Sequence, residues 1–570
     1  MLGEFLQEPR VAYFSMEIAL REEIPTYAGG LGILAGDSLR SAADLGLPLV
    51  AVTLVSRAGY FRQELDSRGR QTERADDWDP ARWARRLDAK VAVRMENRVV
   101  WTGAWLYVIE SHLGGRAPVI LLDTDLPEND PQDRQITHYL YGGEAAYRLQ
   151  QEMILGLGGV RILHALGFDI RTYHMNEGHS ALLSVELLRR HTYPAVDVHE
   201  GEPTYDLPLV RELCRFTTHT PVEAGHDRFP YELVTRLFAS EAPISAASAP
   251  TASASGLIDL ALLKELAGQE SLNMTRLALN MSEFVNGVAR RHAEVSAKLF
   301  PGYRVRAITN GVHPYFWTAA SFRQLYDRFV PGWCHEPELL VRADLIPDEA
   351  LLEAHRQAKQ VLLDRVRDLT GVELSPRLAT LGFARRMTAY KRPELLFSDL
   401  ERLRGMSRQY PFQIILAGKA HPQDAGGKQL IERLHECARS LSDCVPVVFL
   451  PNYDLALAQR LVSGCDIWVN TPLPPLEASG TSGMKAAFNG VPSLSVPDGW
   501  WVEGGLEGMT GWSFEDATGL YDKLDRVVLP ASYGPSGAWA QIMRGCITKN
   551  AAYFNSHRMM RRYATEAYLR

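Results

Sequence analysis

The chain lacks most of the features that mark secreted, membrane-spanning and zinc-binding proteins. It has only six cysteines in 570 residues and no CxxC pair; they are Cys214, Cys334, Cys437, Cys444, Cys465 and Cys546. Such scattered cysteines indicate free thiols rather than disulfides or a zinc site. No run approaches ~20 uninterrupted apolar residues, so no membrane span is predicted. The N-terminal residues MLGEFLQEPRVAYFSME show no signal peptide, and we expect a soluble, cytoplasmic protein.

Long runs of lysine or arginine are also missing. The 61 basic residues are slightly outnumbered by 68 acidic residues, which gives a formal net charge of −7. This balance argues against a surface dedicated to nucleic acid or to an anionic membrane, although it is compatible with a local basic pocket. We therefore expect neither nucleic acid nor a membrane as a partner.

Short β-branched runs alternate with segments of helical period along most of the chain. The predicted strands are 11–16, 47–55, 99–110, 118–125 and 215–221, followed in the second half by 378–383, 413–418, 445–451, 466–470 and 492–496. Apolar strands separated by helices are typical of a parallel sheet covered on both faces. Because the chain is longer than the roughly 250–300 residues of a single core, we predict two α/β domains that face each other across a cleft.

The predicted domains span residues 1–315 and 316–550, since a strand-like segment ends in Asn-Gly shortly before residue 315. Residues 551–570 are predicted to form a C-terminal helix that crosses back to the N-terminal domain. The segment 242–256, APISAASAPTASASG, is low in charge and rich in Ala, Ser and Pro, and we expect it to be a flexible insertion.

Two segments of the second half indicate a binding site for anions. EASGTSGMKAAFNG (477–490) is a bare loop that enters a helix, where free N–H groups and the helix dipole favour phosphate, although its spacing is not that of a nucleotide P-loop. GFARRMTAYKRPE (382–394) follows a predicted strand and is rich in basic residues, among them Arg386 and Lys391. The alternative for this segment is a solvated helix start. Two basic residues that face an anion-binding loop favour two phosphate groups close together.

Polar clusters also follow apolar runs in the first half. YAGGLGILAGD (27–37) is a glycine-rich turn that enters a helix, HMNEGHSALL (174–183) contains Asn176 and Glu177, and FTTHTPVEAGHD (216–227) contains His219. Each is open to a structural interpretation, because a single histidine is more often a structural residue than a catalyst. The His and Glu residues of 174–179 do not have the spacing of a zinc site, so no metal is predicted.

Together these residues resemble the α-glucan phosphorylases, the glycogen, starch and maltodextrin phosphorylases, and in particular their short bacterial and archaeal branch. Eight motifs in the order of that family carry the resemblance over nearly the whole chain: YAGGLG, NEGHSA, FTTHTP, NMTRLALNMSEFVNGVARRH, ITNGVHPYFW, ARRMTAYKR, PNYDLALAQ and EASGTSGMKAAFNG. The resemblance implies two Rossmann-like domains in the GT-B glycosyltransferase arrangement. It also implies a homodimer, and the absence of the N-terminal extension through which animal enzymes are regulated.

The resemblance implies a pyridoxal 5'-phosphate cofactor held by Lys485 as a Schiff base. The cofactor's phosphate, rather than its ring, would act as an acid–base relay beside the substrate phosphate. The other cofactor-binding residues implied are Arg385, Gly480, Thr481, Ser482, Gly483, Tyr453 and Gly30.

The implied reaction is the reversible phosphorolysis of an α-1,4-glucan at its non-reducing end, which yields α-D-glucose 1-phosphate with retention. The catalytic residues implied are Lys485, Arg386, Lys391, His219 and Glu477, with Arg386 and Lys391 on the substrate phosphate. Glu477 and Tyr390 would bind the 2- and 3-hydroxyls of the glucose, and Asn310 and His219 its 6-hydroxyl. The Ser479 backbone would lie against the sugar. Leu31, Glu17, Asn176 and Glu177 would line the approach.

The chain departs from better-known family members at three positions, which have Lys at 385, His at 388 and Arg at 454 where this chain has Arg385, Thr388 and Asp454. Two other functions remain open: a glucosyltransferase of the same architecture that uses a nucleotide sugar, and a non-catalytic glucan-binding relative. Lys485 in its EASGTSGMK setting favours a phosphorylase over both, because neither alternative needs that lysine.

Overall fold

The computed structural model describes residues 2–7, 10–199, 202, 204–222, 225–238 and 259–569. The predicted insertion at 242–256 lies outside these residues. Within the described part of the chain, no helix is both long enough and apolar enough to cross a membrane.

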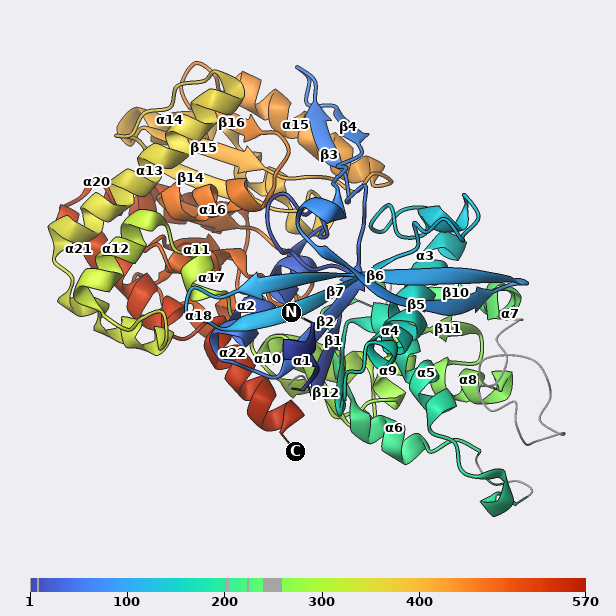
Figure 1. The fold of residues 1–570 in the computed structure, drawn as a ribbon. Coiled ribbons are helices and arrows are strands. Elements are labelled where there is room, and N and C mark those ends of the chain that lie inside the picture. The colour runs from blue at the N-terminus through green and yellow to red at the C-terminus, as the bar shows by residue number, and fades with distance from the viewer. Residues whose placement is uncertain are drawn as a thin grey trace.

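In the described residues, nine strands of the first half form one sheet, in the order β13-β12-β9-β8-β1-β2-β7-β6-β5 (Figure 1). Their bounds are β1 (Val11–Phe14), β2 (Leu49–Leu54), β5 (Arg85–Met95), β6 (Arg98–Glu110), β7 (Arg116–Asp123), β8 (Thr172–Asn176), β9 (Cys214–Thr217), β12 (Phe284–Gly287) and β13 (Arg306–Ala307). From β13 to β7 all neighbours are parallel, whereas β6 pairs antiparallel with both β7 and β5.

The burial of the strands explains this division. Every residue of β1 and β2 is buried, as expected for parallel strands covered on both faces, and this part of the prediction is confirmed. The antiparallel edge of β5 and β6 was not predicted. Strand β5, RRLDAKVAVRM, carries charged residues and is partly exposed, so its sequence does not stand out as an apolar run.

Within the described chain, six parallel strands of the second half form a separate sheet, in the order β16-β15-β14-β17-β18-β19. Their bounds are β14 (Ala379–Ala384), β15 (Phe412–Ala417), β16 (Val447–Leu450), β17 (Ile467–Asn470), β18 (Ser493–Ser495) and β19 (Gly511–Ser513). The strands predicted between 378 and 496 coincide with β14 to β18, and the α/β fold class is confirmed. Among the described strands of this sheet, only the short β19 was not predicted.

Helices cover both sheets (Figure 1). Those of the first half are α1 (Gly3–Leu6), α2 (Gly30–Asp44), α3 (Ala145–Met153), α4 (Gly159–Ala165), α5 (Leu182–Arg190), α6 (Leu207–Leu213), α7 (Tyr231–Phe238), α8 (Leu260–Ala267), α9 (Met274–Asn280) and α10 (Arg290–Leu299). From the junction onward they are α11 (Pro314–Trp317), α12 (Ala320–Phe329), α13 (Asp348–Thr370), α14 (Leu400–Gln409), α15 (Ala425–Ser440), α16 (Leu455–Gly464), α17 (Ser482–Ala487), α18 (Trp501–Gly504), α19 (Ala517–Lys523), α20 (Leu529–Tyr533), α21 (Ser536–Gly545) and α22 (Ser556–Tyr563).

The C-terminal helix α22 packs against α2 and the first sheet, which places both ends of the chain on the first half (Figure 1). The Ser556 hydroxyl lies 2.6 Å from that of Ser41 in α2. The Tyr563 hydroxyl accepts a hydrogen bond from Asn286 Nδ2 of β12 at 2.9 Å. The chain therefore crosses from the second half back to the first. The exact domain boundary after residue 315 stays a prediction.

A hairpin of the first half makes a second connection. Its strands β3 (Arg62–Leu65) and β4 (Gln71–Arg74) lie beside α15 of the second half (Figure 1). Gln63 Nε2 donates to the carbonyl of Gly418, and Gln71 Nε2 donates to the carbonyl of Ala420, both at 2.9 Å. Side-chain amides thus join the two halves across this edge.

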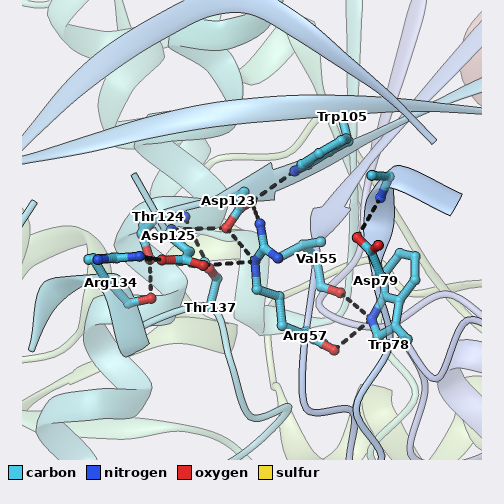
Figure 2. A network of polar contacts seen from close by, with 12 residues as sticks. Val55, Arg57, Trp78, Asp79, Trp105, Asp123, Thr124, Asp125, Arg134 and Thr137 are labelled. Atoms are coloured by element: carbon cyan, nitrogen blue, oxygen red, sulfur yellow. Dashed lines mark hydrogen bonds and ion pairs between the residues drawn. The ribbon is translucent and has the colours of Figure 1, made fainter. Parts of the chain in front are cut away.

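A buried polar network closes the carboxyl end of β7 (Figure 2). Asp123 accepts a hydrogen bond from Trp105 Nε1 at 2.8 Å and pairs with Arg57 Nη2 at 2.6 Å. The Arg57 Nε atom also lies 3.5 Å from the carboxylate of Asp125. Because these groups satisfy one another, this strand end is closed by internal contacts.

Candidate functional site

The basic segment and the glycine-rich loop of the second half leave adjacent strands. Arg385 and Arg386 follow β14, and the segment that contains Glu477 follows β17, which pairs in parallel with β14. Parallel neighbours end at the same edge of a sheet, where α/β proteins bind their ligands. The sheet topology therefore brings together two segments that are far apart in the sequence.

The carboxylate of Glu477 is the centre of this group. It lies 3.0 Å from Arg385 Nη2, and it accepts a hydrogen bond from Lys391 Nζ. All three side chains are at least nine-tenths buried. The backbone N–H of Glu477 donates to Asp498 Oδ2 at 2.9 Å, which fixes the loop. Two cations thus converge on one carboxylate.

The electrostatics of this group favour an additional anion. Burial acts to raise the pKa of Glu477, but the charges of Arg385 and Lys391 lower it. Burial and, to a lesser extent, the charge of Arg385 lower the pKa of Lys391, Glu477 opposes both effects, and the net result is a pKa of about 8. At neutral pH two cations therefore share one carboxylate, and the group keeps one excess positive charge.

Arg386 lies differently from its neighbour. Its side chain is exposed and forms no hydrogen bond or ion pair within the described residues. Burial raises the pKa of Tyr60, Arg386 opposes that rise, and Glu17 adds to it. Arg386 of the second half and Glu17 of the first half therefore lie near the same phenol, and the guanidinium is available to a ligand.

The glycine-rich loop permits close approaches. Gly480 has a φ of 66°, and a Cβ atom there would lie 3.2 Å from Glu477 Oε1. A Cβ atom on Gly483 would lie 2.6 Å from the ring of Trp500. The carbonyl of Thr481 accepts from the Lys485 N–H at 3.2 Å, which begins α17. The hydroxyl of Ser482 accepts a hydrogen bond from Trp468 Nε1 at 2.9 Å.

Lys485 lies in α17 with its amine buried. Its Nζ atom lies 4.0 Å from the centroid of a Trp317 ring and forms no hydrogen bond within the described chain. Burial lowers the pKa of Lys485 to about 8; Asp37 opposes this effect and Arg40 adds to it. Burying an amine without a hydrogen-bond acceptor costs folding free energy. This cost points to a functional role for the Lys485 amine.

The first half contributes a connected group around His219. His219 Nε2 lies 2.7 Å from Asn176 Oδ1, and its backbone N–H donates to Glu177 Oε2 at 2.8 Å. Burial lowers the pKa of His219 to about 4, while Glu177 opposes the shift, so the ring is neutral at pH 7. Glu177 also accepts from Gly178 N and Thr220 Oγ1, so its carboxylate positions the 218–220 segment.

Glu17 supports the start of α2. Its carboxylate accepts from the backbone N–H groups of Ala28 and Gly29 at 2.6 and 3.0 Å, and from Tyr141 at 3.0 Å. Gly30, the first residue of α2, has open space where a Cβ atom would stand. Leu31 follows it and is half-buried. The N-terminus of α2 is therefore accessible, and Glu17 holds the turn that leads into it.

Of the remaining predicted residues, Tyr390 and Tyr453 lie near the Glu477 group, and Asn310 belongs to the first half. Asn310 is buried, and its Oδ1 atom has no hydrogen-bond partner within the described residues. Burial raises the pKa of Tyr390 to about 12, and its ring lies 4.5 Å from Lys391 Nζ. The carbonyl of Ser479 accepts from the Trp500 N–H at 2.8 Å. Burial raises the pKa of Tyr453, and Arg385 opposes the rise.

The three departures have different consequences. Asp454 caps α16, because its carboxylate accepts from the Leu457 N–H at 2.8 Å. Thr388 Oγ1 and Arg385 Nη1 are both buried and, in the described part of the chain, have no hydrogen-bond partner. Two of the three departures thus leave polar atoms available beside the Glu477 group.

A cavity of about 760 Å³ opens next to this group, between α10 of the first half and α18 of the second. It is lined by Arg290, Arg291, Asp498, Glu503 and Tyr553, among others. None of the predicted site residues lines it. Its contact with the site runs through Asp498, which holds the Glu477 backbone.

Sequence reasoning missed three side chains of the site: Asp498, Asp37 and Trp317. Asp37 and Trp317 are the last residues of the motifs YAGGLGILAGD and ITNGVHPYFW, so both lie within motifs that the sequence had singled out. An aspartate inside an otherwise apolar helix was the available signal for Asp37, because a buried carboxylate requires partners.

A cluster of Asp44, His313 and His557 has the composition of a metal site, with its potential ligand atoms within 4.8 Å of one another. The backbone N–H of Phe316 donates to His313 Nδ1 at 3.0 Å. That bond leaves the ring proton on Nε2, which donates to Asp44 at 2.8 Å. His313 therefore offers Asp44 a proton instead of offering a metal a lone pair.

Comparison with known proteins finds similarity along the chain. The family described as carbohydrate phosphorylase matches residues 166–505. Maltodextrin phosphorylase of Thermococcus litoralis is 35% identical over 99% of this chain and 70% of that protein. Glycogen phosphorylase of Mycobacterium tuberculosis is 36% identical over 98% of this chain and 70% of that protein. Glycogen phosphorylase of Aquifex aeolicus is 33% identical over 98% of this chain and 86% of that protein.

Proposed function

Because this chain belongs to the carbohydrate phosphorylase family, we propose that it is an α-1,4-glucan phosphorylase. The reaction transfers the non-reducing-end glucose of glycogen or maltodextrin to inorganic phosphate. It yields α-D-glucose 1-phosphate with retention and a glucan shorter by one residue, and it is reversible. The observation that carries this proposal is that one glycine-rich segment bears both the buried amine of Lys485 and Glu477, whose carboxylate is paired with two cations.

Lys485 and residues of the basic segment fit pyridoxal 5'-phosphate as the cofactor. The Lys485 amine has no acceptor within the described chain, and Arg385 Nη1 and Thr388 Oγ1 are buried donors without partners. A phosphate group satisfies such donors. Lys485 would hold the cofactor covalently, Arg385 and the Thr481 segment its phosphate, and Tyr453 its ring. When bound, the cofactor supplies a phosphate that exchanges a proton with the substrate phosphate.

Arg386 and Lys391 would bind the substrate phosphate. Arg386 is exposed and has no partner in the described residues, so binding breaks no existing contact. The Lys391 amine donates a hydrogen bond to Glu477, which holds it in the group where we place the substrate phosphate. Their charges, with the accessible N-terminus of α2 at Gly30, offset the repulsion between two phosphate groups.

The sugar would be held by residues from both halves. The Glu477 carboxylate would accept hydrogen bonds from the 2- and 3-hydroxyls, and the Tyr390 hydroxyl would donate to them. Asn310 and neutral His219 would bind the 6-hydroxyl. The unpaired Oδ1 atom of buried Asn310 supports this assignment, because a hydroxyl donor would satisfy it. Glu477 is a binding residue here rather than a nucleophile, since two cations hold its carboxylate.

The test is an absorbance spectrum between 300 and 450 nm of the purified protein and of Lys485→Ala. We expect a band near ~330 nm or ~415 nm in the parent that the variant lacks even after incubation with pyridoxal 5'-phosphate. The parent should then release glucose 1-phosphate from maltoheptaose only when phosphate is present. A folded parent without a band, or one that uses a nucleotide sugar instead of phosphate, contradicts the proposal.

We also propose that the protein is a cytoplasmic homodimer, which the family resemblance and the scattered free cysteines support. Light scattering of the purified protein tests its oligomeric state. A monomer at micromolar concentration contradicts this part of the proposal.

A further inference from the structure

The amine of Lys485 rests on an indole that belongs to a different part of the chain. Its Nζ atom lies 4.0 Å from the ring centroid of Trp317, the last residue of α11. Trp317 is 1% exposed, so the ring is fixed by its surroundings. Asn489 Nδ2 bridges the two residues, since it lies 2.9 Å from the Trp317 carbonyl and 3.1 Å from that of Lys485.

Asp37 of α2 holds the other edge of this indole. Trp317 Nε1 donates to both of its carboxylate oxygens, at 3.0 and 2.8 Å. Arg40 Nη1 lies 3.7 Å from the same carboxylate, and Arg40 Nη2 donates to the carbonyls of Ala19 and Leu20. Asp37 is therefore a buried carboxylate whose main hydrogen-bond partner is the ring beneath Lys485.

We propose that Asp37 is a positioning residue for the cofactor-binding lysine, acting on the Lys485 amine through the Trp317 indole and through its own negative charge. This inference rests on the proposed function, because it takes Lys485 as the attachment site. It joins α2 of the first half to α17 of the second, so that the lysine is held in place from across the junction.

The charge of Asp37 has a direct chemical consequence. Lys485 would hold the cofactor through its amine nitrogen, which has to be neutral to bond the aldehyde carbon; both amine protons would leave with the aldehyde oxygen as water. Asp37 and Arg40, both on α2, are the charged groups that act on this amine; burial raises the pKa of Asp37, and the charges of Lys485 and Arg40 oppose that rise. Burial lowers the pKa of Lys485 to about 8, and Asp37 limits the fall by stabilising the ammonium form. Removing the charge extends the neutral amine to lower pH.

The experiment measures the pH dependence of cofactor uptake. Parent and variants are freed of any pyridoxal group with hydroxylamine and dialysed. The rate at which pyridoxal 5'-phosphate restores the absorbance band is then followed from pH 6 to 9. In Asp37→Asn, which keeps a hydrogen-bond acceptor but loses the charge, the midpoint should fall by about one pH unit. Asp37→Glu restores the charge and should move the midpoint back.

The chain offers a matched control. Asp123 is likewise buried, accepts from the indole of Trp105 and pairs with Arg57 (Figure 2). It is not among the groups that act on Lys485. Asp123→Asn should therefore keep the midpoint of the parent. Trp317→Phe keeps a ring but loses the N–H donor to Asp37, and it should slow uptake severalfold without moving the midpoint.

The outcomes separate this inference from the proposed function. If the folded parent takes up no cofactor, the proposed function fails. If the parent takes it up and Asp37→Asn has the same midpoint and rate, Asp37 has no positioning role and the inference is overturned. A shift shared equally by Asp123→Asn also overturns it, because the effect would then be general. A parent-like uptake rate in Trp317→Phe refutes the route through the indole.

Discussion

Glu477 and Lys391 form a buried ion pair in which the carboxylate is shared with a second cation, Arg385 Nη2 at 3.0 Å. In the proposed reaction Lys391 binds phosphate and Glu477 binds sugar hydroxyls. The ion pair therefore holds the phosphate-binding lysine and the sugar-binding carboxylate next to each other. A bound phosphate adds the negative charge that the group of two cations and one carboxylate lacks.

The first prediction concerns the loss of this carboxylate. Glu477→Gln leaves Arg385 and Lys391 buried without a counter-ion, so the protein should unfold at a lower temperature. Phosphate should raise that temperature more in the variant than in the parent, because it supplies the missing charge. We also expect kcat to fall about 10²–10³-fold through the lost sugar contact. Thermal melts with and without phosphate test the first point, and steady-state assays the second.

The control for this substitution is Glu507→Gln, which breaks an exposed ion pair with Lys523 and should change little. If phosphate stabilised Glu477→Gln no more than the parent, the two cations would not form the phosphate site.

The second prediction is a pH dependence of phosphate binding. Burial lowers the pKa of Lys391 to about 8, so its ammonium form is lost as the pH rises through that value. The KM for phosphate should rise between pH 7.5 and 9 in the parent. In Lys391→Arg it should rise less, since a guanidinium keeps its proton throughout this range. Identical profiles for parent and variant would mean that Lys391 does not contact phosphate.

The third prediction separates binding from stability at Arg386. Because this exposed side chain has no partner within the described residues, Arg386→Ala should change the free energy of unfolding by less than about 0.5 kcal/mol. The KM for phosphate should rise about 10–100-fold, as expected for a lost charge-assisted hydrogen bond. Arg408→Ala, another exposed arginine, is the control. An unchanged KM would remove Arg386 from the site.

The fourth prediction concerns acid stability. Burial lowers the pKa of His219, His292 and His313 to about 4 each. The unfolded chain therefore binds more protons than the folded chain between pH 6.5 and about 4. The free energy of unfolding should be greatest above pH 6.5 and fall across this window, by up to roughly 3 kcal/mol per histidine.

Urea unfolding at pH 4.5, 5.5 and 6.5 measures this effect. His313→Asn removes one of the three groups and should flatten the dependence, whereas His199→Asn, at an exposed position, should not. A stability that stays constant from pH 6.5 to 4.5 is incompatible with buried neutral histidines.

The sequence could predict those features that arise locally. Apolar runs predicted β14 to β18, because parallel strands that are buried on both faces consist mostly of apolar residues. Glycines 480 and 483 were recognised because close approach of the backbone requires the absence of a side chain. The order of eight motifs identified the family, and with it the role of Lys485, whereas the basic segment was recognised from its composition.

Tertiary structure alone decided which of these groups meet and in which state. Arg385 and Glu477 become partners because β14 and β17 are neighbours in the sheet, although β15 and β16 separate them in the sequence. The antiparallel edge formed by β5 was hidden by its charged residues. The contact of Asp37 with Trp317, and through it with Lys485, joins three helices from distant parts of the chain. No local pattern specifies such contacts, because pairing and burial depend on which surfaces pack together, whereas composition and spacing fix only what each segment can become.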